Sequence, residues 1–464
     1  MYRKTMAAVL AAGLAISVNG VSTYIPAQAQ SAPASSTAFD NKIIKKISAD
    51  NMYNTIATLS AQPREAGTEG ELIGAKYIKG KFEEYGYETE LQPFPIYEAI
   101  RNNVSGTLEI NGQSLNPYVF SGSYSGEVTA EIVHVGLALD GQVPDNVKGK
   151  IALIERGGIT FVEKLQNVID KGAVGVILYN NAGTGNNVGV ADPGQNIPAV
   201  SITRAQGLAL VEQLQKGPVE AHLKVTGSGF VEKTSYNVIA SMKPNKNRDN
   251  GQVVLVGAHH DSVSGGPGAN DDASGVSAVL ELARVMAKVP TDTELRFVTF
   301  GAEEKGLLGS YHYAGTLSEE EADNIVAHFQ MDMIGSKDAG ADNPAGGLIM
   351  YTIDGQKNLV TDLAAAAGAR TSEVIPYGQL GRSDHQPFHE LGIPAALFIH
   401  SPVEPWYHTP ADTIDKIDKN KLQQTAEIVG ASVYQIARPD TPAMEHARVA
   451  PGPVPYEFED RPVQ

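Results

Sequence analysis

The chain has 464 residues, of which 42% are hydrophobic and 19% are charged, which is enough for two folded domains with sizeable cores. Its formal net charge of -17 disfavours nucleic acid and anionic membranes as partners, because proteins that bind polyanions present a basic face. The sequence has no cysteine, which excludes disulfide bonds and thiolate metal ligands.

The first residues have the pattern of a secretory signal. Arg3 and Lys4 precede an apolar run at 6–18, and an Ala-Gln-Ala sequence follows as a cleavage site. The apolar run is shorter than the roughly 20 residues that a membrane span requires, so we expect a signal peptide over 1–29. The protein is then secreted, into the medium or to the cell wall or periplasm, and has no stable membrane association.

The composition and the spacing of apolar residues change along the rest of the chain. Residues 30–41 are expected to form a linker, and residues 42–100 show helical spacing of apolar residues around a loop. Short β-rich runs fill 101–230, which predicts an inserted domain. Strands and helices alternate over 231–438, and a proline-rich tail occupies 439–464. The predicted fold class is α/β, with a mostly parallel mixed sheet sandwiched by helices and an inserted small β-rich α+β domain.

Polar side chains follow several strands expected in the region after residue 231, such as "VVLVGAH", "ELRFVTFGAEE" and "AHFQMD". A glycine-rich loop and the segment "WYHTPAD" add further polar residues. Ligand sites in open α/β sheets gather beyond the carboxyl ends of the strands. We therefore expect these side chains to converge at one edge: His259, Asp271, Glu303, Glu304, Asp332 and His408.

Imidazole and carboxylate groups are the ligands that zinc takes when no thiolate is present. Two neighbouring metal ions need one carboxylate that reaches both, and Asp271, in the glycine-rich loop, suits that bridging place. His259 with Asp332 would complete one site, and His408 with Glu304 the other. The expected cofactors are therefore two Zn²⁺ ions per chain.

Glu303 is adjacent to a ligand but is not needed for coordination, so it suits a general base that takes a proton from a metal-bridging water. Asp261 lies two residues beyond His259 and could accept the proton on the other ring nitrogen. His385 and His389 have helical ligand spacing, but Pro387 between them is expected to break that geometry. No Gly-x-Ser-x-Gly or His-Glu-x-x-His motif occurs, which disfavours other hydrolase chemistries.

Five ordered segments, "GAHHDS", "GANDDASGV", "FGAEEKGLLGS", "QMDMIG" and "YHTPAD", resemble the metal-site motifs of the di-zinc aminopeptidase family. That family includes secreted bacterial leucyl aminopeptidases, glutamate carboxypeptidase II and glutaminyl cyclase. The resemblance extends from about Ile43 to Ala437 and implies the zinc-exopeptidase, phosphorylase/hydrolase-like fold. The segment "VKGKIALIERGGITFVEKLQNVIDKGAVGVILYNN" resembles a protease-associated (PA) domain, which is inserted in several such exopeptidases.

The resemblance implies the same roles: His259, Asp271, Glu304, Asp332 and His408 as metal ligands, and Glu303 as the general base. It also implies a cis peptide bond between Asp271 and Asp272, which places Asp272 beside the metal site. Tyr407 matches a tyrosine that hydrogen-bonds the tetrahedral oxyanion, although aromatic packing is an alternative role. Arg382 and Asp384 are candidates for substrate binding.

The function expected from these features is a secreted zinc aminopeptidase that hydrolyses N-terminal residues of peptides with a free N-terminus. The family implies a broad preference with a lean toward leucine and other large apolar residues. We expect a monomer without a nucleic-acid partner. A carboxypeptidase or a glutaminyl cyclase on the same scaffold, or a non-catalytic binding protein, are the alternatives; the complete ligand set favours the two-metal enzyme.

Overall fold

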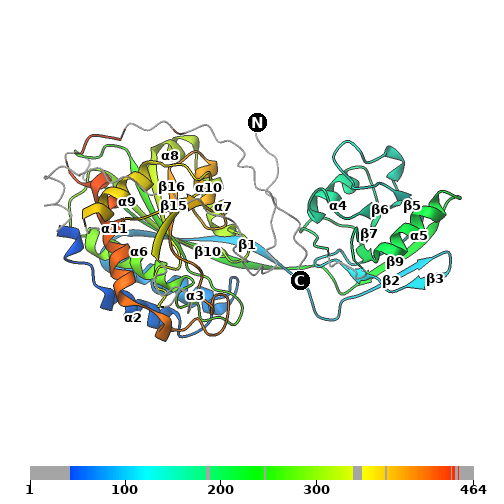
Figure 1. The fold of residues 1–464 in the computed structure, drawn as a ribbon, viewed down its shortest axis with the longest axis horizontal. Helices are drawn as coiled ribbons and strands as arrows, with labels where there is room; N and C mark the ends of the chain where they lie inside the picture. The colour runs from blue at the N-terminus through cyan, green and yellow to red at the C-terminus, as the bar shows by residue number, and fades with distance from the viewer. Residues whose placement is uncertain are drawn as a thin grey trace. The chain divides into compact units, whose positions relative to one another are not determined.

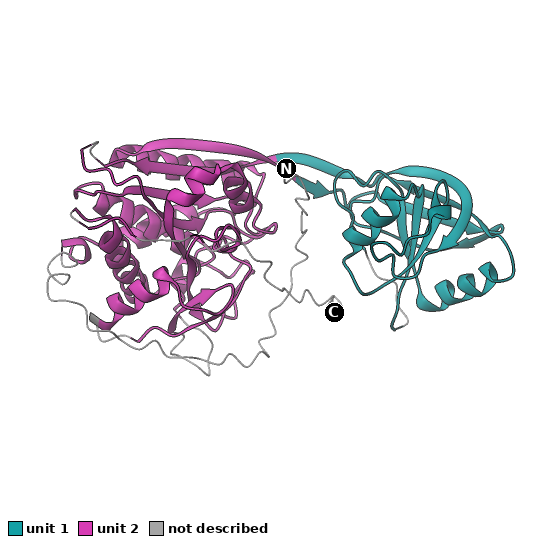
Figure 2. Cartoon of the chain, turned by 90° about the horizontal axis from the view of Figure 1, so that it is seen from above, with its two compact units in different colours: residues 1–10, 97–233, 457–464 teal, residues 11–96, 234–456 magenta. Residues whose placement is uncertain are grey.

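The computed structural model describes residues 42–183, 189–244, 247–337, 347–370, 374–439, 441–444 and 448. The expected signal peptide, the linker and most of the proline-rich tail lie outside these residues. The chain forms two compact units, coloured in Figure 2. Unit 1 comprises Tyr97–Lys233, and unit 2 comprises the described residues up to Ile96 and from Thr234 onward.

Unit 2 is built on a mixed sheet that has eight strands among the described residues, in the order β1-β10-β12-β11-β13-β16-β14-β15. The four strands β12, β11, β13 and β16 are mutually parallel, and Val256 of β11 pairs with Phe297 on one side and Phe329 on the other. The strand bounds are β1 Glu88–Ala99, β10 Phe230–Met242, β11 Val253–His259, β12 Glu294–Phe300, β13 Ile325–Met331, β14 Gly347–Thr352, β15 Tyr377–Gln379 and β16 Ala395–Ser401.

Helices cover both faces of this sheet (Figure 1). Every residue of β11 and β13 is buried, which explains the near-continuous apolar runs of these strands, because parallel strands between two helical layers have no solvent-facing side. One layer contains α2 (Ala49–Leu59), α3 (Glu69–Tyr85), α6 (Ala273–Met286), α9 (Leu359–Arg370) and α11 (Lys419–Ala437), and the other contains α7 (Leu308–Thr316), α8 (Glu319–Asn324) and α10 (Gln386–Glu390).

Unit 1 contains a second mixed sheet, in the order β3-β2-β9-β5-β6-β7-β8-β4. Strands β5 to β8 are parallel, and their buried residues form two apolar clusters of the unit's own. The elements are β2 Ser105–Ile110, β3 Gln113–Leu115, β4 Tyr118–Val119, β5 Gly126–His134, β6 Ile151–Glu155, α4 Phe161–Asp170, β7 Gly175–Tyr179, β8 Ala199–Ile202, α5 Arg204–Leu214 and β9 Glu220–Thr226.

The expected α/β fold class is therefore confirmed, with a small β-rich unit inserted between the two parts of the larger one. One local expectation was wrong. Pro387 does not break the helix between His385 and His389, because it lies in the first turn of α10, where a proline costs no intrahelical hydrogen bond. Within the described part of the chain, no helix combines the length and the apolar character needed to cross a membrane.

Candidate functional site

The polar residues singled out in the sequence lie at the carboxyl ends of neighbouring parallel strands. His259 is the last residue of β11, Asp332 follows β13 directly, and Glu303 and Glu304 follow β12 after two residues. His408 lies in the loop after β16, with a left-handed backbone at φ 58°. Since these strands are parallel neighbours, their carboxyl ends meet at one edge of the sheet and bring the side chains together.

The loop between β11 and α6 supplies Asp271. The peptide bond between Asp271 and Asp272 is cis, as expected. Asp272 caps α6: its Oδ1 accepts hydrogen bonds from the N–H of Gly275 (2.8 Å) and of Met333 (3.1 Å), and its Oδ2 accepts from the N–H of His259 (3.2 Å). Asp272 therefore joins three elements behind the site.

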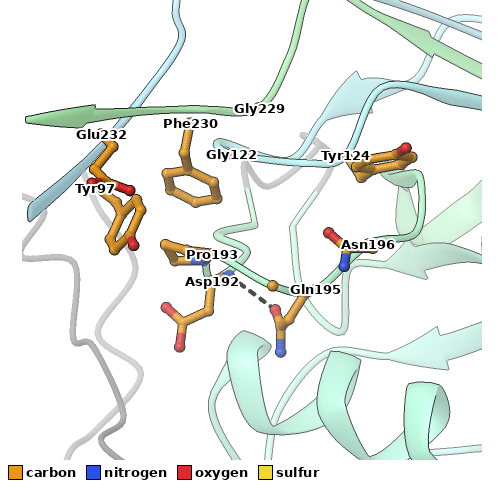
Figure 3. Close-up of a pocket in the computed structure, with 11 residues that line it drawn as sticks. Tyr97, Gly122, Tyr124, Asp192, Pro193, Gln195, Asn196, Gly229, Phe230 and Glu232 are labelled. Carbon is orange, nitrogen blue, oxygen red and sulfur yellow. Dashed lines mark hydrogen bonds between the residues drawn. The ribbon is translucent and has the colours of Figure 1, made fainter. Parts of the chain in front are cut away.

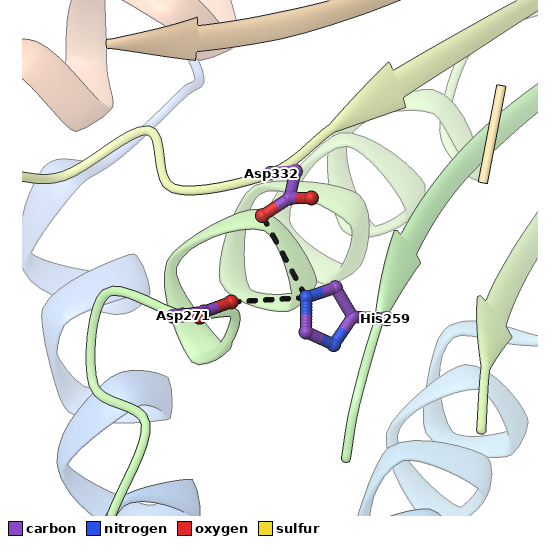
Figure 4. Close-up of side chains that lie close together, drawn as sticks. All are labelled: His259, Asp271 and Asp332. Atoms are coloured by element: carbon purple, nitrogen blue, oxygen red, sulfur yellow. Dashed lines mark hydrogen bonds and ion pairs between the residues drawn. The ribbon is translucent and has the colours of Figure 1, made fainter. Parts of the chain in front are cut away.

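Three of the side chains form a first group, which Figure 4 shows in close-up. His259 Nε2 lies 3.1 Å from Asp271 Oδ1 and 3.6 Å from Asp332 Oδ1. All three residues are buried. Ser383 supports the arrangement, because its hydroxyl donates a hydrogen bond to Asp332 Oδ2 at 2.8 Å.

A second group shares Asp271 with the first and adds Glu304 and His408. His408 Nε2 lies 3.2 Å from Asp271 Oδ2 and 3.1 Å from Glu304 Oε2. The two oxygens of Asp271 thus face different histidines. The structure brings together all five candidate ligands, in the pairing that the sequence suggested.

The donor set fits bound zinc. Buried carboxylate oxygens are normally paired with a donor, yet Glu304 Oε1 and Asp332 Oδ1 have no hydrogen-bond partner. Divalent cations would satisfy such oxygens. Two histidines and three carboxylates, without a cysteine, are ligands that zinc accepts.

Glu303 lies beside the first group without belonging to either. Its Oε2 is 3.9 Å from His259 Nε2. Burial and the nearby carboxylates of Glu304, Asp384 and Asp332 raise the pKa of Glu303 well above its ordinary value. A raised pKa means a stronger affinity for a proton, which suits a group that accepts one.

Asp261 is held differently from the expectation. Its Oδ1 lies 3.4 Å from His259 Nδ1, which is long for a hydrogen bond. Its shorter contacts come from the backbone N–H groups of Glu303 (3.0 Å) and Glu304 (3.2 Å). Asp261 therefore faces His259 and at the same time fixes the turn after β12 that carries both glutamates.

The carboxylates of the site shift the pKa of His408, and His408 in turn affects the pKa of Glu304. Burial disfavours the imidazolium of His408, but hydrogen bonds with Asp271 and Glu304 outweigh burial and raise its pKa to about 10. Burial and the charge of Asp271 raise the pKa of Glu304 to about 7, against the effect of His408.

The remaining expected residues lie around this centre. The Tyr407 ring stacks on the His408 ring, with centroids 3.6 Å apart, and burial raises the pKa of its phenol. Asp384 is fully buried, and Gln330 donates a hydrogen bond to it at 3.4 Å. Arg382 is exposed and has a left-handed backbone.

Sequence reasoning missed Arg64, which is buried in unit 2 beneath the metal-site loop. Its guanidinium donates to the carbonyls of His260 (2.7 Å), Pro267 (2.7 Å) and Gly268 (2.9 Å), and to one carbonyl at the end of α2. Burial lowers its pKa to about 10, although the charge of Asp261 opposes the change. No local pattern marks this arginine, because its three partners in the metal-site loop lie about 200 residues away in the sequence.

The chain matches two families. Residues 237–433 match peptidase family M28, and residues 128–210 match the PA domain. Aminopeptidase YwaD of Bacillus subtilis is 40% identical over 84% of this chain and 85% of its own length.

Solved structures agree with these matches. The aminopeptidase from Aneurinibacillus sp. strain AM-1 is 51% identical, covers 88% of this chain and 98% of its own, and superposes with a TM-score of 0.69. BSAP, a zinc aminopeptidase from Bacillus subtilis, is 38% identical over 84% of this chain and 96% of its own, with a TM-score of 0.57.

Proposed function

The chain belongs to peptidase family M28 and is a zinc aminopeptidase, and we propose that it works with two zinc ions per chain and with Glu303 as general base. The observation that carries this proposal is the sharing of Asp271 between two adjoining groups of histidine and carboxylate side chains. One metal would be held by His259, Asp271 and Asp332, and the other by Asp271, Glu304 and His408. Bound zinc supplies Lewis acidity that polarises the scissile carbonyl group.

Glu303 performs the proton transfers of the proposed reaction. Its carboxylate takes a proton from the attacking water and delivers it to the nitrogen of the leaving amine. Its position beside His259, outside both groups of ligands, leaves its oxygens available for this role. Asp261 positions Glu303 through the hydrogen bond to its backbone N–H.

Tyr407 is the proposed donor to the oxyanion of the tetrahedral intermediate. Burial raises the pKa of its phenol, so the group keeps its proton and can donate a hydrogen bond. Its stacking on the ring of His408 holds it at the edge of the second group. If Tyr407 served only in aromatic packing, Tyr407→Phe would leave the rate of peptide hydrolysis unchanged.

Substrate recognition follows from the charges and apolar surfaces of the site. The free α-amine is positively charged, and Glu303 and Asp332 offer it negative partners. The proposed side-chain preference is broad and leans to leucine and other large apolar residues. Arg382, which is exposed, is the proposed substrate contact, whereas Asp384, which is buried, acts through Gln330.

The organisation of the chain completes the proposal. Residues 101–230 form the PA domain, inserted between peptidase parts at 42–100 and 231–438. A signal peptide over 1–29 directs a monomer out of the cell. N-terminal sequencing of the protein from culture medium, beginning at or after residue 30, and light scattering at the monomer mass are the results expected.

Two matched variants test the site. Glu303→Gln should keep close to two zinc ions and lower kcat on Leu p-nitroanilide by roughly 10²- to 10⁴-fold, because the proton acceptor is lost while the ligands remain. Asp271→Asn should lower both zinc content and rate, since it changes the shared ligand. Near-normal turnover by Glu303→Gln would exclude it as the base, and cleavage of N-acetyl-Leu p-nitroanilide by the parent enzyme would contradict recognition of the free amine.

A further inference from the structure

Unit 1 contains a pocket of about 320 Å³. None of its lining residues belongs to the metal centre. Figure 3 shows its lining: the aromatic rings of Tyr97, Tyr124 and Phe230 stand around it together with the carboxylates of Asp192 and Glu232. Tyr97 and Tyr124 are exposed to 40% and 49%, so these rings remain accessible to a ligand.

The walls of the pocket are fixed by hydrogen bonds between distant segments. The Ala191 N–H donates to the Ser121 carbonyl at 2.9 Å. The Ser125 hydroxyl donates to the Ser228 carbonyl at 2.6 Å, and it accepts a hydrogen bond from the Ser228 N–H at 2.9 Å. The Ile100 N–H donates to the Gly229 carbonyl at 2.9 Å. Because the backbone segments are connected in this way, the pocket is largely formed before a ligand arrives.

Phe230 packs directly on the backbone of Gly122. Gly122 has a φ of +76°, and a Cβ atom there would lie 2.1 Å from the Phe230 ring. Only glycine combines this backbone conformation with such a close approach. The position of the ring in the pocket is therefore built into the fold.

The negative charge of the pocket has no cationic partner in the part of the chain that the structure describes. Asp192 Oδ1 is buried and accepts no hydrogen bond, and burial raises the pKa of Asp192 to about 6. Glu232 faces Tyr97 and raises the pKa of that phenol. No ion pair of the described residues involves either carboxylate. Burying the unpaired carboxylate of Asp192 costs folding free energy, and a bound cation would offset this cost.

We propose that this pocket binds the cationic side chain of an arginine or lysine in a peptide. Aromatic faces attract organic cations, and they do so best where water is partly excluded. The two carboxylates add charge complementarity and repel anionic ligands. A hard metal ion such as calcium takes 6 to 8 oxygen ligands, whereas this pocket offers two carboxylates and the amides of Gln195 and Asn196 among three aromatic rings.

The proposed pocket goes beyond the aminopeptidase function. Its binding is measurable without turnover, and its residues take no part in the proposed proton transfers. A failure of the zinc mechanism would leave it unaffected, and the two proposals can be overturned separately.

Calorimetric titration of the zinc-loaded protein tests the pocket with blocked tripeptides that have no free amine. The probes are N-acetyl-Gly-Arg-Gly-amide and its matched forms with norleucine and with glutamate in place of arginine. The arginine peptide should bind at least about 5-fold more tightly than the norleucine peptide, given the usual strength of cation–π contacts, and the glutamate peptide should bind more weakly still. Equal binding of all three would overturn the proposal, as would calcium binding that excludes the arginine peptide.

Substitutions in the pocket test whether the arginine peptide binds there. Asp192→Asn and Phe230→Leu should each weaken the arginine peptide by roughly 5-fold or more, because one removes the charge and the other the aromatic face. Asp140→Asn is the matched control: it makes the same change at an exposed position of unit 1 and should leave binding unchanged. Unchanged binding by both pocket variants would overturn the assignment. Hydrolysis of Leu p-nitroanilide should stay at the parental rate in all three, which shows that the proteins are folded.

Discussion

The positively charged side chain of Arg64 contacts the acidic loop between β11 and α6. The loop carbonyls that it binds belong to His260, Pro267 and Gly268, which lie between the ligands His259 and Asp271 in the sequence. A guanidinium group presents several donors in a fixed planar arrangement. One side chain therefore sets the course of the loop that brings the two ligands together.

Replacing this arginine should damage both stability and metal binding. We expect Arg64→Met to lower the free energy of unfolding by about 3 kcal/mol or more, because buried carbonyls lose charged donors. Urea unfolding measures the loss, and zinc content should fall with it. The control is Arg248→Met, at a side chain that is 54% exposed and whose contact with the Asp292 carboxylate is long, at 3.9 Å. There we expect the free energy of unfolding to fall by less than about 0.5 kcal/mol. Similar losses in both variants would contradict the role given to Arg64.

At the scale of elements, helix α6 approaches strand β13 unusually closely. A Cβ atom at Gly275 would lie 2.4 Å from the Met331 carbonyl and 2.5 Å from the Asp272 carboxylate. The first turn of α6 therefore depends on glycine at this position. The close approach allows Asp272 to hydrogen-bond both the helix and Met333 beyond β13.

Two glycine-to-alanine changes in helices should have opposite signs. Alanine is favoured over glycine by about 1 kcal/mol in a helix interior, and at Gly80 of α3 a Cβ meets nothing within 4 Å. Gly80→Ala should therefore stabilise the protein by up to about 1 kcal/mol. Gly275→Ala should destabilise it by about 2 kcal/mol or more, because of the clash. Chemical denaturation measures both, and stabilisation by Gly275→Ala would refute the close contact.

Strand β13 also carries a buried histidine that must stay neutral. The ring of His328 lies between Phe388, at 4.1 Å between centroids, and Phe300, at 6.2 Å. Burial, together with the charge of His385, lowers the pKa of His328 well below 6.5. Below pH 6.5, the unfolded chain binds a proton there that the folded chain does not bind. Acid therefore favours the unfolded state through this residue.

The sign of this effect gives a pH prediction. As pH falls from 7 to 5, His328 should lower the free energy of unfolding by about 2 kcal/mol, at roughly 1.4 kcal/mol per pH unit below 6.5. His328→Leu should lose that dependence, so its stability should fall less than the parent's over the same range. Phe329→Leu, at another buried position of β13, provides the control, because it removes no titrating group and should keep the parental slope with pH. Parallel curves for the parent and His328→Leu would contradict the prediction.

At the scale of the whole molecule, the two units have separate apolar cores. The clusters of unit 1 contain residues from Leu108 to Val225 only, whereas those of unit 2 are built from the two outer parts of the chain. The metal centre belongs to unit 2 alone. Metal binding should therefore stabilise one unit without the other.

Metal removal tests this separation. Chelation with EDTA should lower the melting temperature of unit 2 by about 10 °C or more, since ligand binding to the folded state stabilises it and each kcal/mol corresponds to about 2–4 °C in a unit of this size. The transition of unit 1 should not move. Calorimetry resolves the two transitions, and added zinc should restore the first. An equal shift of both transitions would mean that the units unfold together.

The sequence by itself determined the fold class and the residues that the structure brings together at the metal centre. His259, Glu304 and Asp332 are recognisable because each lies at or just beyond the carboxyl end of a strand, and the carboxyl ends of parallel strands share an edge. Local patterns also placed Asp271 in a glycine-rich loop before a helix. These inferences hold because apolar periodicity and turn residues act over a few neighbouring positions.

Only the tertiary structure decided the contacts between distant segments. Arg64 braces a loop about 200 residues away, Asp261 binds the backbone of the glutamate turn more closely than it approaches His259, and α10 accommodates Pro387 in its first turn. The pocket of unit 1 is assembled from strands β1 and β10, at residues 97 and 230, and from loops around residues 122 and 192. No local pattern marks such sites, because side chains that meet through packing and long-range hydrogen bonds can lie anywhere along the chain.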